Sequence, residues 1–147
     1  MAPAAEPPFE LHPRLAADTR VLRQWPLCAV LLMDDARYPW CILVPRRTGI
    51  REIYELSTDD QQQLLRESSA LGRALMQTFG GTKLNVAALG NVVPQLHVHH
   101  VVRFEHDAAW PGPVWGRHPP EPYDDEARRT FVERLSPHLP DSGPATS

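Results

Sequence analysis

This chain contains apolar runs of strand length and one long segment whose apolar residues recur at helical spacing. LCAVLLM (27–33) and WCILVP (40–45) are continuous apolar runs, and the turn residues DDARYP between them predict a hairpin. The segment 57–81 predicts the longest helix, because Ser57 can cap its start and Gly80 or Gly81 can end it. One face of that helix is expected to form core: Leu64, Leu65, Ser68, Leu71, Leu75, Met76 and Phe79.

The remaining segments complete an α+β pattern. Residues 13–24 predict a short helix, 83–89 and 95–104 predict strands on either side of a glycine turn, and 124–135 predict a last short helix. A hairpin, a helix and two strands in this order indicate an α+β domain with an antiparallel sheet and helices packed on one face. Residues 1–8 are expected to be flexible. The composition of the tail, 137–147, predicts disorder.

Composition narrows the class of protein. The 147 residues suffice for one domain with its own core, and the net charge of −3 gives no sign of the basic face that a nucleic-acid partner requires. No apolar run approaches the ~20 residues of a membrane span. The first ten residues lack the basic and apolar regions of a signal peptide, so a cytoplasmic location is expected. Cys28 and Cys41 are accordingly predicted to be reduced core thiols.

The segment PQLHVHHVVRF (94–104) holds three of the seven histidines within four residues. Because side chains alternate across a strand, Gln95, His97 and His99 share one face, whereas His100 points to the other. The face that carries His100 is otherwise apolar and is predicted to lie under the long helix. The face that carries His97 and His99 is expected to meet solvent or a functional site.

The residues alone leave three interpretations of the His97 and His99 pair. Side chains two apart on a strand are rooted about 7 Å apart, so two neutral rings can converge on one phosphate group. One ring can then attack phosphorus while the other stabilises the charge on its oxygens. The pair can instead bind zinc, with Glu105, His106 or Asp107 as a third ligand. The two histidines can also be ordinary polar residues on a solvated face of the sheet.

The sequence around these histidines resembles the histidine triad (HIT) superfamily of nucleotide hydrolases and transferases, whose signature alternates histidines with apolar residues. Here the signature reads QLHVHHV (95–101). WCILVPRR (40–47) is similar to the family's strand that ends in proline and basic residues. LNVAALGNVVPQLHVH (84–99) is similar to its asparagine-bearing strand, glycine turn and histidine strand. The resemblance implies a HIT-like sheet of about five strands and covers 9–118, which leaves 119–136 as a C-terminal helical extension. It is strongest for the bacterial diadenosine-tetraphosphate-hydrolase-like branch.

A covalent mechanism follows from the resemblance. It implies that His97 attacks the α-phosphate of a nucleotide and that water hydrolyses the nucleotidyl intermediate, while His99 contacts the phosphate oxygens. The Nδ1–H group of His97 is expected to donate to a backbone carbonyl, which leaves Nε2 free. Asp34 matches a carboxylate that binds ribose hydroxyls, although an exposed turn residue is the alternative. The positions that match the family's phosphate pocket are Asn85, Gly90 and Asn91.

Two residues depart from the family signature. Gln95 stands where the first histidine is expected; it can form hydrogen bonds to an oxygen or a leaving group but cannot deliver a proton at neutral pH. His100 replaces an apolar residue and is expected to be a buried histidine with a hydrogen-bond partner. Arg103 is expected at the surface, with contact to a distal phosphate as the alternative. Trp110 and Trp115 can stack on a base or pack at a dimer seam, and packing is the favoured interpretation.

The leading hypothesis is a nucleotide hydrolase that cleaves a dinucleoside polyphosphate or a nucleoside phosphoramidate at the α-phosphate. It implies a purine nucleotide substrate, no cofactor or metal, no nucleic-acid or membrane partner, and a homodimer. Nucleotidyl transfer is less expected than hydrolysis. Gln95 motivates the first alternative, a nucleotide-binding regulator with little catalysis. The second alternative is a metal-dependent enzyme that uses His97 and His99 as ligands.

Overall fold

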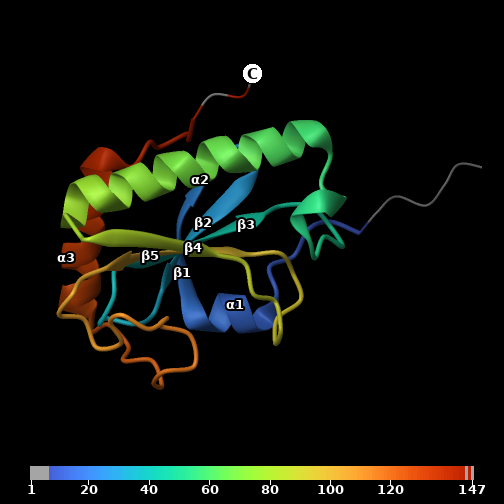
Figure 1. Ribbon diagram of the computed structural model, residues 1–147. Helices are drawn as coiled ribbons and strands as arrows, with labels where there is room; N and C mark the ends of the chain where they lie inside the picture. The colour runs from blue at the N-terminus through green and yellow to red at the C-terminus, as the bar shows by residue number, and fades with distance from the viewer. Residues whose placement is uncertain (1–6, 145, 147) are drawn as a thin grey trace, which may run out of the picture.

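The chain, described here from a computed structural model over residues 7–144 and 146, forms a five-stranded antiparallel sheet with the strand order β1-β2-β3-β5-β4. The long helix α2 crosses one face of the sheet and the short helix α1 lies on the other side (Figure 1). The predicted α+β fold is therefore confirmed. The elements are α1 Pro13–Asp18, β1 Thr19–Gln24, β2 Cys28–Met33, β3 Trp40–Pro45, η1 Ile53–Glu55, α2 Thr58–Phe79, β4 Lys83–Ala87, β5 Val98–Arg103, α3 Asp125–Leu135 and η2 Ser136–His138.

The predicted hairpin forms the middle of the sheet. β2 and β3 pair antiparallel, with Leu32 opposite Cys41, and β3 then pairs with the histidine strand β5. Both strands are buried along almost their whole length, as continuous apolar runs require. Cys28 and Cys41 are buried free thiols, as predicted, and burial raises the pKa of both.

Helix α2 begins and ends where the sequence predicts. The Ser57 hydroxyl accepts a hydrogen bond from the Asp60 backbone N–H at 3.1 Å, and Gly80 takes the left-handed conformation, with φ of 66°, that ends the helix. Leu71 and Leu75 are fully buried against the sheet, but Leu65 is 68% exposed and does not belong to the core face as predicted. The first buried residues of α2 are Gln63 and Leu64, and Leu65 lies outside this buried face.

The helix predicted over residues 13–24 is present only in its first half. α1 ends at Asp18, where the Thr19 hydroxyl donates to the Leu15 carbonyl, and residues 19–24 form the edge strand β1. An edge strand pairs on one side only, so it tolerates the charged residues that suggested a helix. A register shift between Val21 and Arg23 interrupts its ladder with β2.

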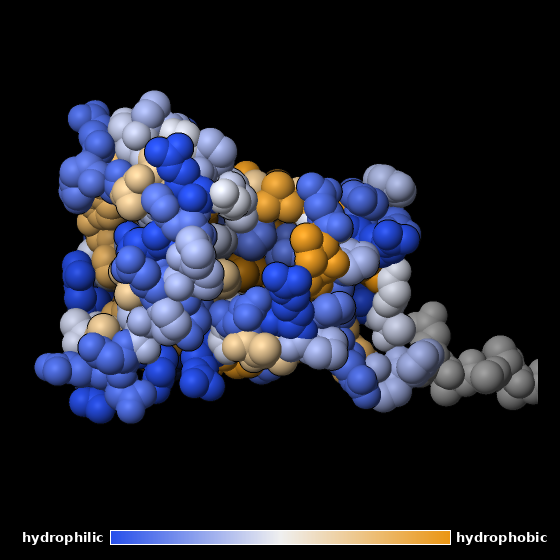
Figure 2. All heavy atoms as spheres, turned by 90° about the horizontal axis from the view of Figure 1, so that it is seen from below, coloured by the Kyte–Doolittle hydropathy of each residue, from blue (hydrophilic) through white to orange (hydrophobic). Residues whose placement is uncertain are grey.

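Apolar residues cover both faces of the sheet. On the α2 side the main core joins the strands to α2, to α3 and to Leu139, with Leu43, Leu71 and Val102 fully buried. On the opposite side a second cluster is built around Leu31, Trp40 and other buried residues from β2, β3, β5 and the loops at 93 and 109–114. Figure 2 shows the molecule from that second side: hydrophilic residues cover most of the surface and a hydrophobic group lies near its middle.

The chain after residue 119 packs onto the same core as α2. The rings of Phe79 and Phe131 stack at 4.8 Å between centroids, and Leu135 is buried. Composition predicts disorder from residue 137, yet Leu139 is buried and the Pro140 carbonyl accepts a hydrogen bond from the Trp25 indole at 2.8 Å. The burial of Leu139 and the hydrogen bond to Pro140 therefore hold this part of the tail against the core, although its composition is polar. The predictions for 1–6, 145 and 147 lie outside the described residues, and the division into segments remains a prediction.

Candidate active site

A cavity of about 620 Å³ opens on the side of the sheet opposite α2. Its walls come from α1, from the end of β2, from the start of β3, from the β5 strand and from the three loops that follow β2, β4 and β5. The residues that line it are Arg14, Met33, Asp35, Trp40, 89–93, His97, His99, 114–116, His118 and Pro120. The cavity thus collects the predicted histidine pair, Gly90 and Asn91 at one place.

His97 lies just before β5, and a hydrogen bond to the backbone determines the tautomer of its ring. The Nδ1 atom is 2.7 Å from the carbonyl oxygen of Gln95. A carbonyl oxygen can only accept a hydrogen bond, so Nδ1 carries the proton and Nε2 of the neutral ring carries the lone pair. The expected contact with a backbone carbonyl is therefore confirmed. Nε2 is the atom that a nucleophilic role requires.

His99 is set in the opposite tautomer. The indole Nε1–H of Trp40 donates to Nδ1 of His99 at 3.0 Å. Because indole is a donor only, Nδ1 must accept and the proton of the neutral ring lies on Nε2. Burial, together with the neighbouring His97 and His100, lowers the pKa of His99 to about 3. His99 is therefore a neutral hydrogen-bond donor at physiological pH.

The two rings lie close enough to act on one group. Their centroids are 4.9 Å apart with an interplanar angle of 70°, and each ring is 7% exposed. The pair presents a lone pair on one Nε2 and an N–H on the other. This arrangement suits attack on an electrophilic phosphorus while a neighbouring oxygen accepts a hydrogen bond.

The glycine turn places two further predicted residues at the cavity. Gly90 has φ of 77°, a conformation that glycine adopts at little cost, and it leads the chain from β4 back towards β5. Asn91 follows it, and both line the cavity beside the histidines. The backbone of this turn therefore forms one wall of the site.

Asn85 and Arg103 belong to a separate buried network. The Asn85 side-chain oxygen accepts from Arg103 at 2.8 Å, and Arg103 makes a two-point ion pair with Asp107 at 2.8 and 3.0 Å. Neither Asn85 nor Arg103 lines the cavity. Arg103 is 2% exposed, so the expectation of a surface arginine is wrong; the loop after β5 folds back over it.

Asp107 organises that loop. Its carboxylate accepts from Arg103 and from the backbone N–H groups of Phe104, Ala109 and Trp110. Burial alone would raise its pKa, but these hydrogen bonds outweigh the burial and lower the pKa to about 2. Asp107 is thereby occupied within the fold, and it does not face the histidine pair as a third ligand.

The predicted ribose carboxylate and its neighbour differ in position. Asp34 accepts a hydrogen bond from the Tyr123 backbone N–H at 2.9 Å and does not line the cavity. Asp35 lines it instead and is 3% exposed. Its carboxylate pairs with Arg37 at 2.9 Å. Of the two neighbouring aspartates, only Asp35 lines the cavity, and a turn pattern alone does not reveal which side chain points inward.

Gln95 points towards the N-terminal segment. Its amide nitrogen donates to the Glu10 carbonyl and its amide oxygen accepts from the His12 N–H, both at 2.9 Å. Both ends of the side chain are thus held by backbone, and Gln95 does not line the cavity. Its contribution to the site described here is the carbonyl that orients His97.

His100 behaves as the sequence predicts. It is fully buried on the α2 side, where Nδ1 contacts the Val98 carbonyl at 3.1 Å and Nε2 is 2.7 Å from the Ser68 hydroxyl. Since the carbonyl must accept, Nδ1 donates and Nε2 accepts from Ser68. Burial lowers its pKa to about 4. His100 is a structural contact between β5 and α2.

Besides Asp35, the cavity contains three polar or aromatic residues that the sequence analysis did not single out: Trp40, Arg14 and His118. Trp40 lies in an apolar run whose periodicity marks it only as core. Arg14 and His118 add cationic or titratable groups to the walls and come from α1 and from the loop 107–122. Trp115, which the sequence left open, packs edge-on against His99 with 5.4 Å between centroids and also lines the cavity.

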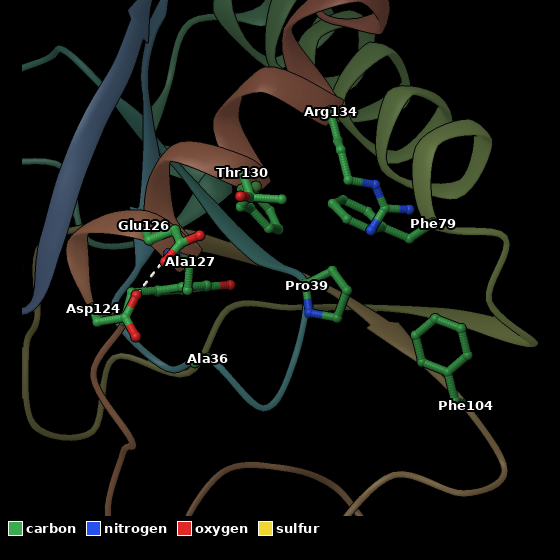
Figure 3. Close-up of a pocket in the computed structure, with 11 residues that line it drawn as sticks. Ala36, Pro39, Phe79, Phe104, Asp124, Glu126, Ala127, Thr130 and Arg134 are labelled. Atoms are coloured by element: carbon green, nitrogen blue, oxygen red, sulfur yellow. Dashed lines mark hydrogen bonds between the residues drawn. The ribbon is translucent and has the colours of Figure 1, made fainter.

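A second cavity, of about 610 Å³, lies beside α3 and is chemically different. Figure 3 shows Arg134 over the ring of Phe79, with Asp124, Glu126 and Thr130 along the helix. No histidine or cysteine is among the described residues that line it. We therefore assign the candidate active site to the cavity of the histidine pair.

Neither a metal centre nor a membrane segment emerges from the described part of the chain. Within residues 7–144 and 146, no group of three or more histidine, cysteine, aspartate or glutamate side chains is placed to hold a metal ion. Over the same residues, no helix combines the length and the apolar character that crossing a membrane demands.

The fold and the paired histidines are typical of a family of nucleotide-binding proteins. The sequence model of the HIT domain matches residues 14–106. The chain belongs to the HIT family, which includes nucleotide hydrolases and transferases.

Three solved structures resemble the whole domain. A histidine triad protein from Marinobacter aquaeolei VT8 is 59% identical and has a TM-score of 0.88, over 90% of this chain and 97% of its own. The Bradyrhizobium japonicum histidine triad protein is 46% identical with a TM-score of 0.88, over 90% and 99%. That of Sinorhizobium meliloti 1021 is 44% identical with a TM-score of 0.87, over 89% and 97%. No protein of curated function matches the chain.

Proposed function

We propose that this protein is a nucleotide hydrolase that cleaves a dinucleoside polyphosphate or a nucleoside phosphoramidate at the α-phosphate, through a nucleotidyl intermediate on His97. The observation that carries the proposal is the pair of complementary tautomers. His97 offers the lone pair of Nε2 and His99 offers an Nε2–H, with 4.9 Å between the ring centroids.

The chemistry follows from those two states. The Nε2 lone pair of His97 attacks the α-phosphorus, a P–N bond forms, and the bond from phosphorus to the leaving group breaks. The ring then gains positive charge, which the Gln95 carbonyl stabilises at Nδ1. His99 donates to a phosphate oxygen as negative charge develops there. A phosphate leaving group departs as its anion, whereas an amine leaving group takes up a proton from solvent. Water next attacks phosphorus and loses a proton to solvent, and the P–N bond breaks to release a nucleoside monophosphate and the neutral ring.

The other predicted site residues have less direct support. The proposal gives Gly90 and Asn91 the role of phosphate contacts, and their position in the lining of the same cavity supports it. Asn85 and Asp34 would act through the fold, since each is bonded to another residue outside the cavity. A purine base, a homodimer, a cytoplasmic location and the diadenosine-tetraphosphate-hydrolase-like branch are parts of the same proposal. So is activity without a cofactor.

Turnover assays with a pair of variants test this function. Purified protein is incubated with diadenosine polyphosphates and with an AMP phosphoramidate, and released AMP is measured by chromatography. We expect turnover in the wild type, loss of turnover in His97→Ala, and a phosphorus-containing adduct on the quenched wild type by mass spectrometry. His106→Ala is the matched control, because His106 is an exposed histidine outside the cavity. Turnover that survives His97→Ala would refute the mechanism.

A nucleotide-binding regulator with little catalysis is the second candidate, and the contacts of Gln95 favour it. Both ends of that side chain are held by Glu10 and His12, so it supplies no proton to a leaving group. This function predicts AMP binding by calorimetry with negligible turnover of every substrate tested. Fast hydrolysis in the assay above would exclude it.

A further inference from the structure

Trp40 makes the one side-chain hydrogen bond to His99 that the described residues provide. Its indole Nε1 lies 3.0 Å from Nδ1 of His99, and the side chains are 5% and 7% exposed. Trp40 begins β3 and His99 lies in the neighbouring strand β5, where Trp40 pairs with Val101 and His99, two residues along the register, pairs with Ile42. Both strands are central in the sheet, so the donor is held on rigid backbone.

We infer that Trp40 is a positioning residue: its indole N–H holds His99 as a neutral ring with the proton on Nε2, aimed at the phosphate oxygen that the reaction charges. This inference rests on the proposed function for its purpose, but the hydrogen bond and the tautomer stand without it. The role requires a donor that can never accept, and indole is such a donor.

The contact does more than fill space. A Trp40 N–H directed at the Nδ1 lone pair occupies the site where His99 would take up a second proton, so it opposes formation of the imidazolium. It also prevents a flip of the ring, because a flipped ring would face the indole N–H with carbon. His99 therefore keeps one orientation and one protonation state through the reaction.

Other groups around His99 cannot substitute for this donor. The rings of His97 and Trp115 meet it edge-on at 4.9 and 5.4 Å between centroids, in contacts that select no tautomer. The charged and titratable groups that share the cavity are Arg14, Asp35, His97 and His118, and His100 lies on the other face of β5. None of them has a hydrogen bond to a ring nitrogen of His99 among the described contacts.

Nitrogen NMR of protein labelled with ¹⁵N tests the inference without substrate. We expect His99 to show its proton on Nε2, and a coupling across the hydrogen bond between Trp40 Nε1 and His99 Nδ1. This measurement uses the wild type alone, so it decides the matter even where a variant fails to fold. A proton on Nδ1 of His99, or no coupling between the two nitrogens, would overturn the inference.

Two tryptophan variants separate positioning from loss of packing. Trp40→Phe removes the N–H and keeps an aromatic ring. Trp25→Phe is the matched control, because Trp25 is also a buried tryptophan that donates one hydrogen bond, to the Pro140 carbonyl at 2.8 Å, away from the cavity. In Trp40→Phe we expect the Nδ1 signal of His99 to move towards that of an unbonded nitrogen and His99 to protonate at higher pH. Trp25→Phe leaves both unchanged.

Kinetics complete the test. We expect kcat to fall at least tenfold in Trp40→Phe, with a smaller change in KM. The upper limit is the ~10²–10³-fold effect of deleting a donor that itself contacts the charged oxygen. Trp25→Phe retains kcat. His99 signals that respond equally to both variants would refute the positioning role. If the wild type turns over no nucleotide while the Trp40→Phe signals shift as expected, the proposed function fails and the positioning of His99 stands.

Discussion

Gln95 accepts a hydrogen bond from the backbone N–H of His12, a residue 83 positions earlier in the chain. The same side chain donates to the Glu10 carbonyl. The position where the HIT signature has its first histidine therefore fastens the N-terminal segment beside the active site. In this protein that position is occupied by a residue that links two parts of the backbone.

These two hydrogen bonds predict that substitution of Gln95 lowers the stability of the fold more than it lowers turnover. Gln95→Ala removes two hydrogen bonds to backbone, so the free energy of unfolding in urea should fall by about 1–2 kcal/mol. Turnover should fall far less than in His97→Ala. Gln61→Ala, which removes one side-chain bond to the Leu56 carbonyl, is the control for a similar loss elsewhere. If Gln95→Ala folds normally and loses turnover as completely as His97→Ala, the residue acts in the chemistry.

The buried histidines predict that acid destabilises the protein well above the range in which carboxylates titrate. The pKa values are about 3 for His99 and about 4 for His100, below the ordinary 6.5, so the unfolded chain binds more protons than the folded one between those values. Stability should therefore be complete above pH 6.5 and decline as pH falls towards 4. Each ring contributes at most about 1.4 kcal/mol per pH unit.

Urea titrations from pH 7.5 to 4.5 measure this decline. His100→Gln removes one titrating ring, so its stability should depend less on pH than that of the wild type. If the slope of stability against pH is the same in His100→Gln as in the wild type, the lowered pKa of His100 is contradicted. Asp107, whose pKa is about 2 instead of 3.8, contributes only as pH falls below about 4 and lies outside this window.

The ion pair of Arg103 and Asp107 predicts a large loss of stability on substitution. Both side chains are almost fully buried, at 2% and 4% exposure, and Asp107→Ala would leave a buried cation without its partner. The free energy of unfolding should fall by about 3–5 kcal/mol. Asp125→Ala breaks the exposed pair with Arg128 and should cost less than about 1 kcal/mol. Similar losses in both variants, by thermal or urea unfolding, would rule out this account.

Arg14 predicts a preference for ligands with more than one phosphate. It lines the cavity and its side chain is 62% exposed, with a loose pair to Asp18 at 3.8 Å. In Arg14→Ala we expect the Kd of ADP or ATP to rise about fivefold relative to that of AMP, because a partly solvated charge contributes about 1 kcal/mol. Arg20→Ala removes the same charge away from this cavity and should leave the ratio unchanged. If calorimetry shows the same change of the Kd ratio in both variants, the effect comes from the net charge of the protein and not from a contact of Arg14 with the ligand.

The sequence predicted those features that depend on local pattern. The hairpin of β2 and β3, the caps of α2 and the two faces of β5 all follow from runs, turns and alternation, which the structure reproduces. β1 was missed because strand pairing with β2 overrode a charged segment that reads as helix. Leu65 was misplaced because the width of a helix's buried face depends on how closely the sheet approaches.

The candidate site was predictable only in part, because most of its contacts are distant in the chain. His97, His99 and the Gly90 turn carry a local motif. The bond from Trp40 to His99 spans 59 residues, and its donor sits in an apolar run without any polar signal. Arg103 and Asp107 stand at a spacing of four, which was the available clue, but their burial arises from the fold of the following loop.

All six residues of β5 are buried, on both faces of the sheet. An ordinary half-exposed strand accepts substitution at every second position, whereas each position here contacts either the α2 core or the active-site side. A saturation library should accordingly show depletion at consecutive codons from 98 to 103 instead of an alternating pattern. New substrate preferences would have to arise in the loops around 88–94 and 113–120, which can diversify while the strand between them stays constant.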